Sequence, residues 1–326
     1  MASLRSQFEE RPVLFPRDVF INDRYDLELS RKKINNVITL GIGDYEAKYL
    51  NGNKPGSKGA HSNVIRLVSL GSGQPAGMFI MKICAYDIDD ADNDNILNLF
   101  SREIKALELA RDNKCKRVIE LIEKGLCRIG KYDYMYYVME YADSDLSNHL
   151  LSGNLKPQQK VLICYDLLRG LRELHNIGVY HRDIKHDNLL MCNNECKVAD
   201  LGLVKFRQET HPELKKRLGA YGWEAPEAIN KYYAERNISW KASYTAGVDC
   251  IVDDKSDVFQ LGKVFWYIFT NKIPVGQLEL VNMPIEDSED IFDAIRKMLL
   301  QDKSSRPNVE EAISLFLPIA KRLGVA

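Results

Sequence analysis

The sequence predicts an α+β protein, with strands in the first half of the chain and long helices in the second. Three apolar, strand-like segments lie at residues 64–70, 78–83 and 134–141. Apolar residues at helical spacing cover 94–111 and 157–176, and a very apolar helix opens at Asp257. The 326 residues suffice for one domain of two lobes or for two small domains.

Composition and net charge argue against some kinds of binding partner and against a membrane-spanning segment. Hydrophobic residues make up 45% of the chain and charged residues 28%, which is ordinary for a soluble globular protein. A net charge of −1 argues against a nucleic-acid or anionic-membrane partner held by bulk charge. The longest apolar runs, such as residues 264–269, are too short to span a membrane. The oligomeric state is not indicated.

The seven cysteines are scattered without a disulfide framework. That distribution favours a reducing, cytoplasmic (intracellular) setting. Cys192 and Cys196 are favoured as plain hairpin positions over a metal site, because no second Cys or His pair stands nearby to complete a tetrahedron.

One stretch concentrates side chains suited to moving a phosphoryl group. It reads His181-Arg182-Asp183-Ile184-Lys185-His186-Asp187-Asn188, followed by Asp200-Leu201-Gly202. Asp183 can accept a hydroxyl proton, and Lys185 can neutralise charge on a phosphate. Asn188 and Asp200 are oxygen donors suited to Mg²⁺. The intervening residues predict a hairpin with its turn at 192–196, which would bring Asn188 and Asp200 together.

This block resembles the catalytic and metal-binding loops of eukaryotic-type protein kinases. The lysine two residues after Asp183, Lys185, resembles the pattern of the Ser/Thr-directed members. Further motifs in the same order extend the resemblance over residues 44–316. It implies a two-lobed fold, with a small, mainly antiparallel β lobe carrying one key helix, a larger α-helical lobe, and ATP between them. We accordingly divide the chain into an N-terminal extension at 1–43, a small lobe at 44–140 and a large lobe at 141–326.

The resemblance also implies an activity. The chain would transfer the γ-phosphate of ATP to a Ser or Thr hydroxyl of a protein substrate, with Asp183 as the base. Lys185 would stabilise the moving phosphate, and Asn188 and Asp200 would hold Mg²⁺. ATP and Mg²⁺ are the expected cofactors.

Lys82 and Glu103 are predicted to pair. Lys82 stands alone in an apolar strand, where a lysine is costly unless it has a partner. Glu103 lies between Leu99 and Leu107 on an apolar helix face. The family pairs such a lysine, which holds ATP phosphates, with such a glutamate. The alternatives are an edge-strand lysine that reaches water and a surface glutamate bordering the apolar stripe.

Two glycine clusters compete for the phosphate-covering loop. The first is Gly41-Ile42-Gly43-Asp44-Tyr45-Glu46, and the second is Gly56-Ser57-Lys58-Gly59-Ala60-His61-Ser62-Asn63-Val64. The first places an acid where the third glycine belongs, and that acid would repel triphosphate. We favour the second, with Gly56, Gly59 and Ser62 near the phosphates and Val64 against the adenine. A plain surface loop is the alternative for either cluster.

The strand at 134–141 resembles the family's last small-lobe strand and its hinge. Met139 would guard the rear of the nucleotide pocket, and Glu140 and Tyr141 would bond adenine through their backbones. Asp145 either reaches a ribose hydroxyl or caps the helix that follows it.

Several other residues gain roles from the resemblance. Asp257 would brace the catalytic-loop backbone, with a helix cap as the alternative. Arg306 would pair with Glu227 of Ala225-Pro226-Glu227, with a surface arginine as the alternative. Phosphorylation of Thr210 would order its loop by pairing with Arg182, although an ordinary exposed threonine is favoured. Residues 230–254 form an extra stretch that could set partner choice.

Two alternative functions come from other classes. A pseudokinase, a nucleotide-binding scaffold without turnover, is supported by the irregular phosphate loop. It is opposed by the complete set Lys82, Glu103, Asp183, Lys185, Asn188 and Asp200. A small-molecule phosphotransferase would also use an Asp with a downstream Asn. Such enzymes generally lack the Ala-Pro-Glu segment and its arginine, both of which are present here.

Overall fold

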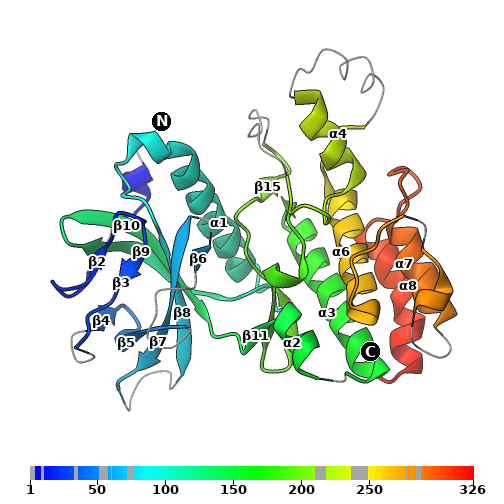
Figure 1. The fold of residues 1–326 in the computed structure, drawn as a ribbon, viewed down its shortest axis with the longest axis horizontal. Coiled ribbons are helices and arrows are strands. Elements are labelled where there is room, and N and C mark those ends of the chain that lie inside the picture. The colour runs from blue at the N-terminus through cyan, green and yellow to red at the C-terminus, as the bar shows by residue number, and fades with distance from the viewer. Residues whose placement is uncertain are drawn as a thin grey trace. The chain divides into compact units, whose positions relative to one another are not determined.

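The chain forms two compact units, which are coloured along the sequence in Figure 1. Unit 1 comprises residues 1–111 and 119–142, and unit 2 comprises residues 112–118 and 143–326. The computed structural model describes residues 4–8, 11–32, 36–50, 58–59, 61–71, 77–153, 155–209, 218–235, 249–276, 278–283 and 288–326.

A mainly antiparallel sheet forms the body of unit 1. Its order is β1-β9-β10-β8-β7-β5-β4, with β6 paired to β7. The strands are β1 (Val13–Leu14), β4 (Val37–Leu40), β5 (Gly43–Tyr49), β6 (Lys58–Gly59), β7 (Ser62–Ser69), β8 (Met78–Cys84), β9 (Leu121–Ile129) and β10 (Tyr132–Glu140). Only β1 and β9 pair in parallel among these strands. A separate two-stranded piece joins β2 (Phe20–Ile21) to β3 (Leu27–Glu28).

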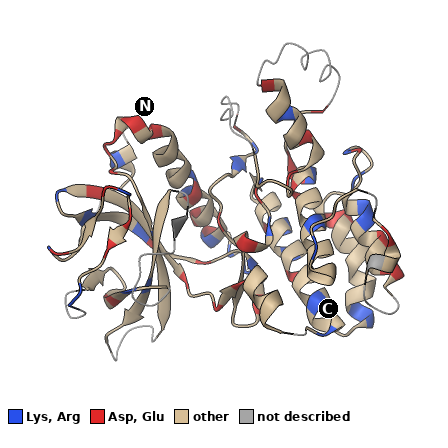
Figure 2. Cartoon of the chain, viewed as in Figure 1, with Lys and Arg blue, Asp and Glu red and all other residues tan. Residues whose placement is uncertain are grey.

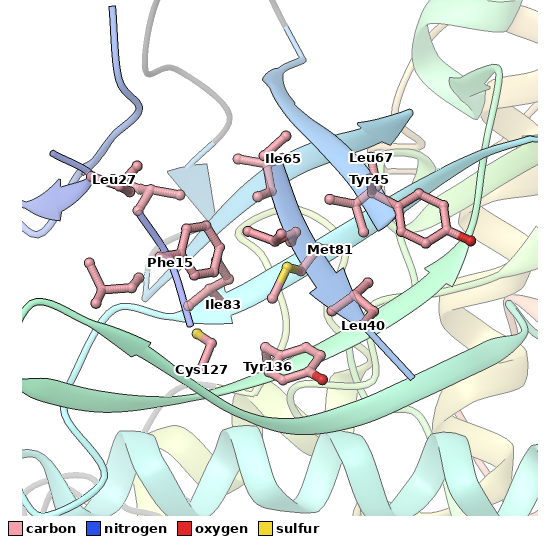
Figure 3. Close-up of a cluster of buried hydrophobic side chains, with 14 of the residues drawn as sticks. Phe15, Leu27, Leu40, Tyr45, Ile65, Leu67, Met81, Ile83, Cys127 and Tyr136 are labelled. Atoms are coloured by element: carbon pink, nitrogen blue, oxygen red, sulfur yellow. The ribbon is translucent and has the colours of Figure 1, made fainter. Parts of the chain in front are cut away.

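One face of this sheet packs against the N-terminal segment (Figure 3). Alternate strand residues point to that face, because side chains along a strand alternate in direction. They include Tyr45, Ile65, Leu67, Met81, Ile83 and Cys127. Phe15, Val19 and Leu27 are buried in the same cluster. Full burial of such a side chain contributes about 1.5–3 kcal/mol. The described part of the segment treated as an extension in the sequence therefore belongs to the core of unit 1.

Arg5, in the short 3-10 helix η1 (Leu4–Gln7), ties the N-terminus to the rest of unit 1. Its guanidinium lies 2.6 Å from Asp89 and 2.7 Å from Asp133. Arg128 also donates to Asp133, at 2.7 and 3.0 Å. Hydrogen bonds from Arg128 and Arg5 lower the pKa of Asp133 against the opposing effect of burial.

Arg5→Ala should lower the free energy of unfolding by at most about 1 kcal/mol, because Arg128 still neutralises Asp133. A carboxylate whose pKa is lowered by folding stabilises the fold above its ordinary pKa and loses that effect as pH falls. The difference between variant and wild type should therefore be present at neutral pH and vanish in acid. Urea denaturation measures it. Arg11→Ala is the control, and an equal loss in that variant would contradict the role of the Arg5 contacts.

Unit 2 is mainly helical. Its helices are α2 (Leu146–Ser152), α3 (Pro157–Asn176), α4 (Pro226–Glu235), α6 (Asp254–Thr270), α7 (Glu289–Met298) and α8 (Val309–Arg322). α3 covers the predicted residues: Pro157 supplies a first position that needs no N–H partner, and Gly178 follows its end at φ +75°. α3 packs against α6 and α8, and α7 packs against both of these helices. α6 is buried on nearly all sides, as its apolar sequence predicts.

Short strands and 3-10 turns complete the described fold. In unit 2 they are β11 (Ser144–Asp145), β12 (Val179–Tyr180), β13 (Leu189–Cys192), β14 (Glu195–Val198), β15 (Lys205–Phe206), η4 (His186–Asn188) and η5 (Leu280–Asn282). In unit 1, η3 (Ala91–Asn93) leads into α1 (Asp94–Asp112). A sheet unit with one long helix and a helical unit confirm the predicted fold class.

Acidic and basic residues are interspersed along the elements of each unit (Figure 2), which agrees with the net charge of −1. Within the described part of the chain, the structure contains no helix with the length and apolar character to cross a membrane.

Candidate active site

Lys82 and Glu103 form a close ion pair in unit 1. Lys82 Nζ lies 2.8 Å from Glu103 Oε1, and the two side chains are 14% and 3% exposed. Lys82 stands on β8 between Val64 of β7 and Tyr137 of β10, so its strand is an interior one. The Tyr137 hydroxyl donates to the same Oε1 at 2.9 Å. The edge-strand and surface-glutamate alternatives therefore do not hold.

Helix α1 presents Glu103 to this lysine because its apolar residues set which side faces inward. Leu97, Phe100, Ile104 and Leu107 are buried, at spacings of three and four residues that share one side of a helix. Glu103 falls on that side, and its contact with Lys82 offsets the cost of burying its charge.

The two glycine clusters lie at opposite ends of the β5–β7 pair. Gly41 and Gly43 belong to the tight turn between β4 and β5, where Gly43 has φ +128°. That turn is held by Glu123 Oε2, which accepts from the Ile42 N–H at 3.1 Å. It is an ordinary hairpin turn, next to the Ser69 end of β7.

The second cluster connects β5 to β7 at the other end, where Val64 pairs with Lys82. Gly59 pairs with Ser62 through β6, and Ser62 is buried. Gly56 lies outside the described residues. The choice of this cluster as the phosphate loop, and its contact with ATP, stay predictions.

The predicted hinge residues end strand β10. Met139 pairs with Ile80 just after an irregularity in the β9–β10 register, and it is half-buried. The Glu140 carboxylate accepts from the backbone N–H of Glu120 at 2.8 Å, and Tyr141 follows the strand. Their backbone contacts with adenine stay a prediction.

In unit 2, Asp257 of α6 holds the backbone that leads to Asp183. Its carboxylate accepts from the His181 N–H at 2.8 Å and from the Arg182 N–H at 2.7 Å. His175 Nε2 lies 2.9 Å from the same carboxylate. Asp253, not Asp257, caps α6, so the cap alternative for Asp257 is wrong.

The Asp183 carboxylate is held from two sides. Oδ1 accepts from the Ala220 N–H at 3.0 Å, and Oδ2 accepts from Asn188 Nδ2 at 2.9 Å. Lys185 Nζ lies 3.7 Å from Oδ2. Burial raises the pKa of Asp183, and the positive charge of Lys185 opposes that shift. The result is an oriented carboxylate that holds a proton more readily than an exposed aspartate.

The hairpin brings Asn188 and Asp200 to one end, as the sequence predicted. Leu189 pairs with Val198, and the Ala199 N–H donates to the Asn188 carbonyl at 3.0 Å. The turn is shorter than predicted: Asn193 and Asn194 alone form it, at φ +50° and +66°. Two successive left-handed residues close a hairpin in two positions, so the strands extend to Cys192 and Glu195.

The oxygen chemistry at this hairpin end fits Mg²⁺. Asn188 Nδ2 donates to both the carbonyl and the carboxylate of Asp183, which leaves Oδ1 as its acceptor atom. Asp200 is exposed and adds a carboxylate at φ +54°. The residues that the structure describes, including Cys192 and Cys196, contain no group of three or more His, Cys, Asp or Glu placed to bind a metal.

Comparison with known proteins identifies the family. The family model described as the protein kinase domain matches residues 54–316, most of the chain. The chain belongs to the protein kinase family. The predicted resemblance to protein kinases is confirmed.

Similar kinases come from distant organisms. Serine/threonine-protein kinase cds1 of Schizosaccharomyces pombe is 30% identical over 233 residues, covering 66% of this chain and 46% of that protein. Serine/threonine-protein kinase STY17 of Arabidopsis thaliana is 25% identical over 252 residues, covering 71% and 39%. Receptor-interacting serine/threonine-protein kinase 1 of Homo sapiens is 30% identical over 188 residues, covering 53% and 25%. This kinase chain thus spans less than half the length of these relatives.

Arg306 and Glu227 form the other predicted pair of this kinase. The guanidinium lies 2.8 and 3.2 Å from the two carboxylate oxygens, and both residues are buried. Arg306 also donates to the backbone carbonyls of Leu300 and Lys255. The surface-arginine alternative is therefore wrong.

Asp145 caps a helix. Its carboxylate accepts from the Asn148 N–H at 2.7 Å and from Asn148 Nδ2 at 2.6 Å. The capping alternative accounts for both oxygens, and a ribose contact stays a prediction.

Thr210 lies outside the described residues, so its pairing with Arg182 stays a hypothesis. In the extra stretch, α4 continues to Glu235, and the described residues resume at Asp249. Lys303 binds that end through Asp249, Ile251 and Asp253.

Two contributors to the surroundings of Asp183 were missed in the sequence. Ala220 acts through its backbone N–H, so its side chain gives no signal. Gln260 is a polar residue in an apolar helix, one turn beyond Asp257 and on the same side. That position could have drawn attention to it.

Proposed function

We propose that this chain transfers the γ-phosphate of ATP to a Ser or Thr hydroxyl of a protein. The observation that carries the proposal is the held carboxylate of Asp183, with Lys185 beside it. Phosphoryl transfer asks mainly for positioning and charge stabilisation.

In the proposed reaction, Asp183 orients the acceptor hydroxyl and takes its proton. The hydroxyl oxygen bonds to the γ-phosphorus, the bond from that phosphorus to the bridging oxygen breaks, and ADP leaves. Lys185 offsets charge on the moving phosphoryl group. Lys82, oriented by Glu103, binds phosphate oxygens of ATP.

Asn188 and Asp200 are the residues that would hold Mg²⁺, which when bound neutralises phosphate charge. Each supplies an oxygen donor from the same hairpin end, and the Asn188 side chain also holds Asp183 in place. Asn188 therefore has a role toward Asp183 that does not depend on a metal.

Three observations support the finer assignments. The relatives above are all named serine/threonine-protein kinases. Lys185 stands two residues after Asp183, as in the Ser/Thr-directed kinases that the sequence resembles. All seven cysteines are free thiols, which supports a reducing, intracellular setting. The assay uses purified protein, Mg²⁺, γ-labelled ATP and a generic protein acceptor, with the labelled amino acid identified after hydrolysis.

The outcomes separate the alternatives. Label on Ser or Thr supports the proposal, and label on Tyr alone contradicts the acceptor assignment. Label on a small metabolite but not on protein would favour a small-molecule phosphotransferase. ATP that raises the melting temperature without turnover would favour a nucleotide-binding scaffold.

Lys82→Met should lower kcat/KM by about 10²–10³-fold, because one preorganised charge on the phosphates is lost. Steady-state phosphorylation at varied ATP measures this change. Lys131→Met, in the exposed turn between β9 and β10, is the matched control and should keep wild-type kinetics. Equal kinetics in the two variants would refute the role of Lys82.

A further inference from the structure

Gln260 is a buried amide of α6, 3% exposed, that binds the catalytic-loop backbone at two points. Its Oε1 accepts from the Ile184 N–H at 3.1 Å, and its Nε2 donates to the Arg182 carbonyl at 3.3 Å. These two peptide groups lie immediately before and after Asp183. The amide therefore binds the backbone on both sides of the proposed base.

Asp257 and Gln260 divide the loop between them. Asp257 accepts from the N–H groups of His181 and Arg182, while Gln260 donates to the Arg182 carbonyl and accepts from the Ile184 N–H. Arg182 has φ +67°, a left-handed conformation that an arginine adopts only when its surroundings hold it there. Both peptide groups of Arg182 are thus fixed by side chains of α6.

Gln260 also lies close to Gly219, which precedes the residue that donates its N–H to Asp183. A Cβ on Gly219 would lie 2.9 Å from Gln260 Nε2, so only glycine allows this close approach, and Gly219 has φ +90°. The next residue, Ala220, donates its N–H to Asp183 Oδ1 at 3.0 Å. One side chain therefore binds the backbone on both sides of Asp183 and lies close to the segment whose N–H holds the carboxylate.

We propose that Gln260 is a positioning residue, which aligns Asp183 with the acceptor hydroxyl by fixing the backbone around it. This inference rests on the proposed function. It requires a group that both accepts and donates, as an amide does, and not merely a side chain that fills the space.

The experiment compares Gln260→Met with Gln260→Glu in the full chain. Methionine matches the length of glutamine without its hydrogen bonds, and kcat should fall about 10- to 100-fold through misplacement of Asp183. The KM for ATP should stay within about twofold of wild type. Val264→Ala, a buried change elsewhere in α6, is the control for general destabilisation.

Gln260→Glu provides a conservative rescue. A neutral carboxyl can accept from the Ile184 N–H and donate to the Arg182 carbonyl, whereas the carboxylate can only accept. The kcat ratio of this variant to wild type should therefore rise as the pH falls from about 8 to about 6, since burial favours the neutral acid. The titratable and charged neighbours His181, Arg182, Asp183, Glu224 and Asp257 are unchanged in Gln260→Met, whose ratio should stay flat with pH.

An active wild type with undiminished kcat in Gln260→Met would overturn this inference alone. The inference would also be overturned if Val264→Ala, with the same melting temperature as Gln260→Met, lost as much kcat. A wild type that binds ATP but transfers no phosphate would defeat the proposed function and this inference together.

Discussion

Replacing Asp183 by asparagine should lower kcat for phosphoryl transfer by about 10²–10⁴-fold, the usual contribution of a positioned general base. An amide cannot accept the hydroxyl proton. It also presents an NH₂ group to one of two donors, since Ala220 and Asn188 both donate to the carboxylate of Asp183. Steady-state phosphorylation gives kcat, and a thermal shift with ATP shows whether nucleotide still binds.

The neighbouring carboxylate Asp187 supplies the matched control. Its side chain is 57% exposed and lies 2.7 Å from His186 Nδ1, so Asp187→Asn should leave kcat near the wild-type value. Comparable losses in both variants would argue that the loop tolerates no amide and would remove the support for Asp183 as base.

The pH dependence of kcat follows from the same carboxylate. Burial raises the pKa of Asp183, and only the ionised form accepts a proton. Activity should therefore fall as the pH is lowered through this raised pKa, at a higher pH than an exposed aspartate would give. Asp183→Asn should abolish that acidic limb from whatever activity remains.

The sequence predicted best where a polar residue conflicts with its surroundings. Lys82 in an apolar strand and Glu103 on an apolar helix face each need a partner, and the structure joins them at 2.8 Å. The Asn-Asn turn likewise encodes the hairpin end that brings Asn188 and Asp200 together. In these cases a local cost, of burial or of backbone conformation, indicates the contact.

The sequence predicted least where pairing is distant or carried by backbone. β1 has two residues and pairs with β9, more than 100 positions later in the chain. A strand this short has no periodic pattern from which the pairing could be predicted. Phe15, Val19 and Leu27 consequently read as an extension although they are core. The hydrogen bond from the Ala220 N–H could not be predicted for another reason: any residue except proline would supply the same backbone donor.

The largest loss of stability should come from Arg306→Met, at about 3–5 kcal/mol of unfolding free energy in the two-state approximation. Arg306 donates hydrogen bonds of 2.8 and 3.2 Å to the Glu227 carboxylate. The change therefore leaves Glu227 buried and charged without this cation. It also removes donors from the carbonyls of Leu300 and Lys255. Chemical denaturation followed by circular dichroism measures the loss.

Arg296→Met is the matched control for this prediction, because Arg296 and its partner Asp293 are each 59% exposed. An exposed pair of this kind contributes at most about 1 kcal/mol. Adding Glu227→Gln to Arg306→Met should cost less than the sum of the two single changes, because the second removes the charge that the first leaves unpaired. Equal losses for Arg306→Met and Arg296→Met, or strict additivity in the double variant, would contradict a stabilising buried pair. We expect Arg306→Met to cost more than Arg296→Met because of desolvation. Water can replace the lost partner of the exposed carboxylate of Asp293, but not that of the buried carboxylate of Glu227.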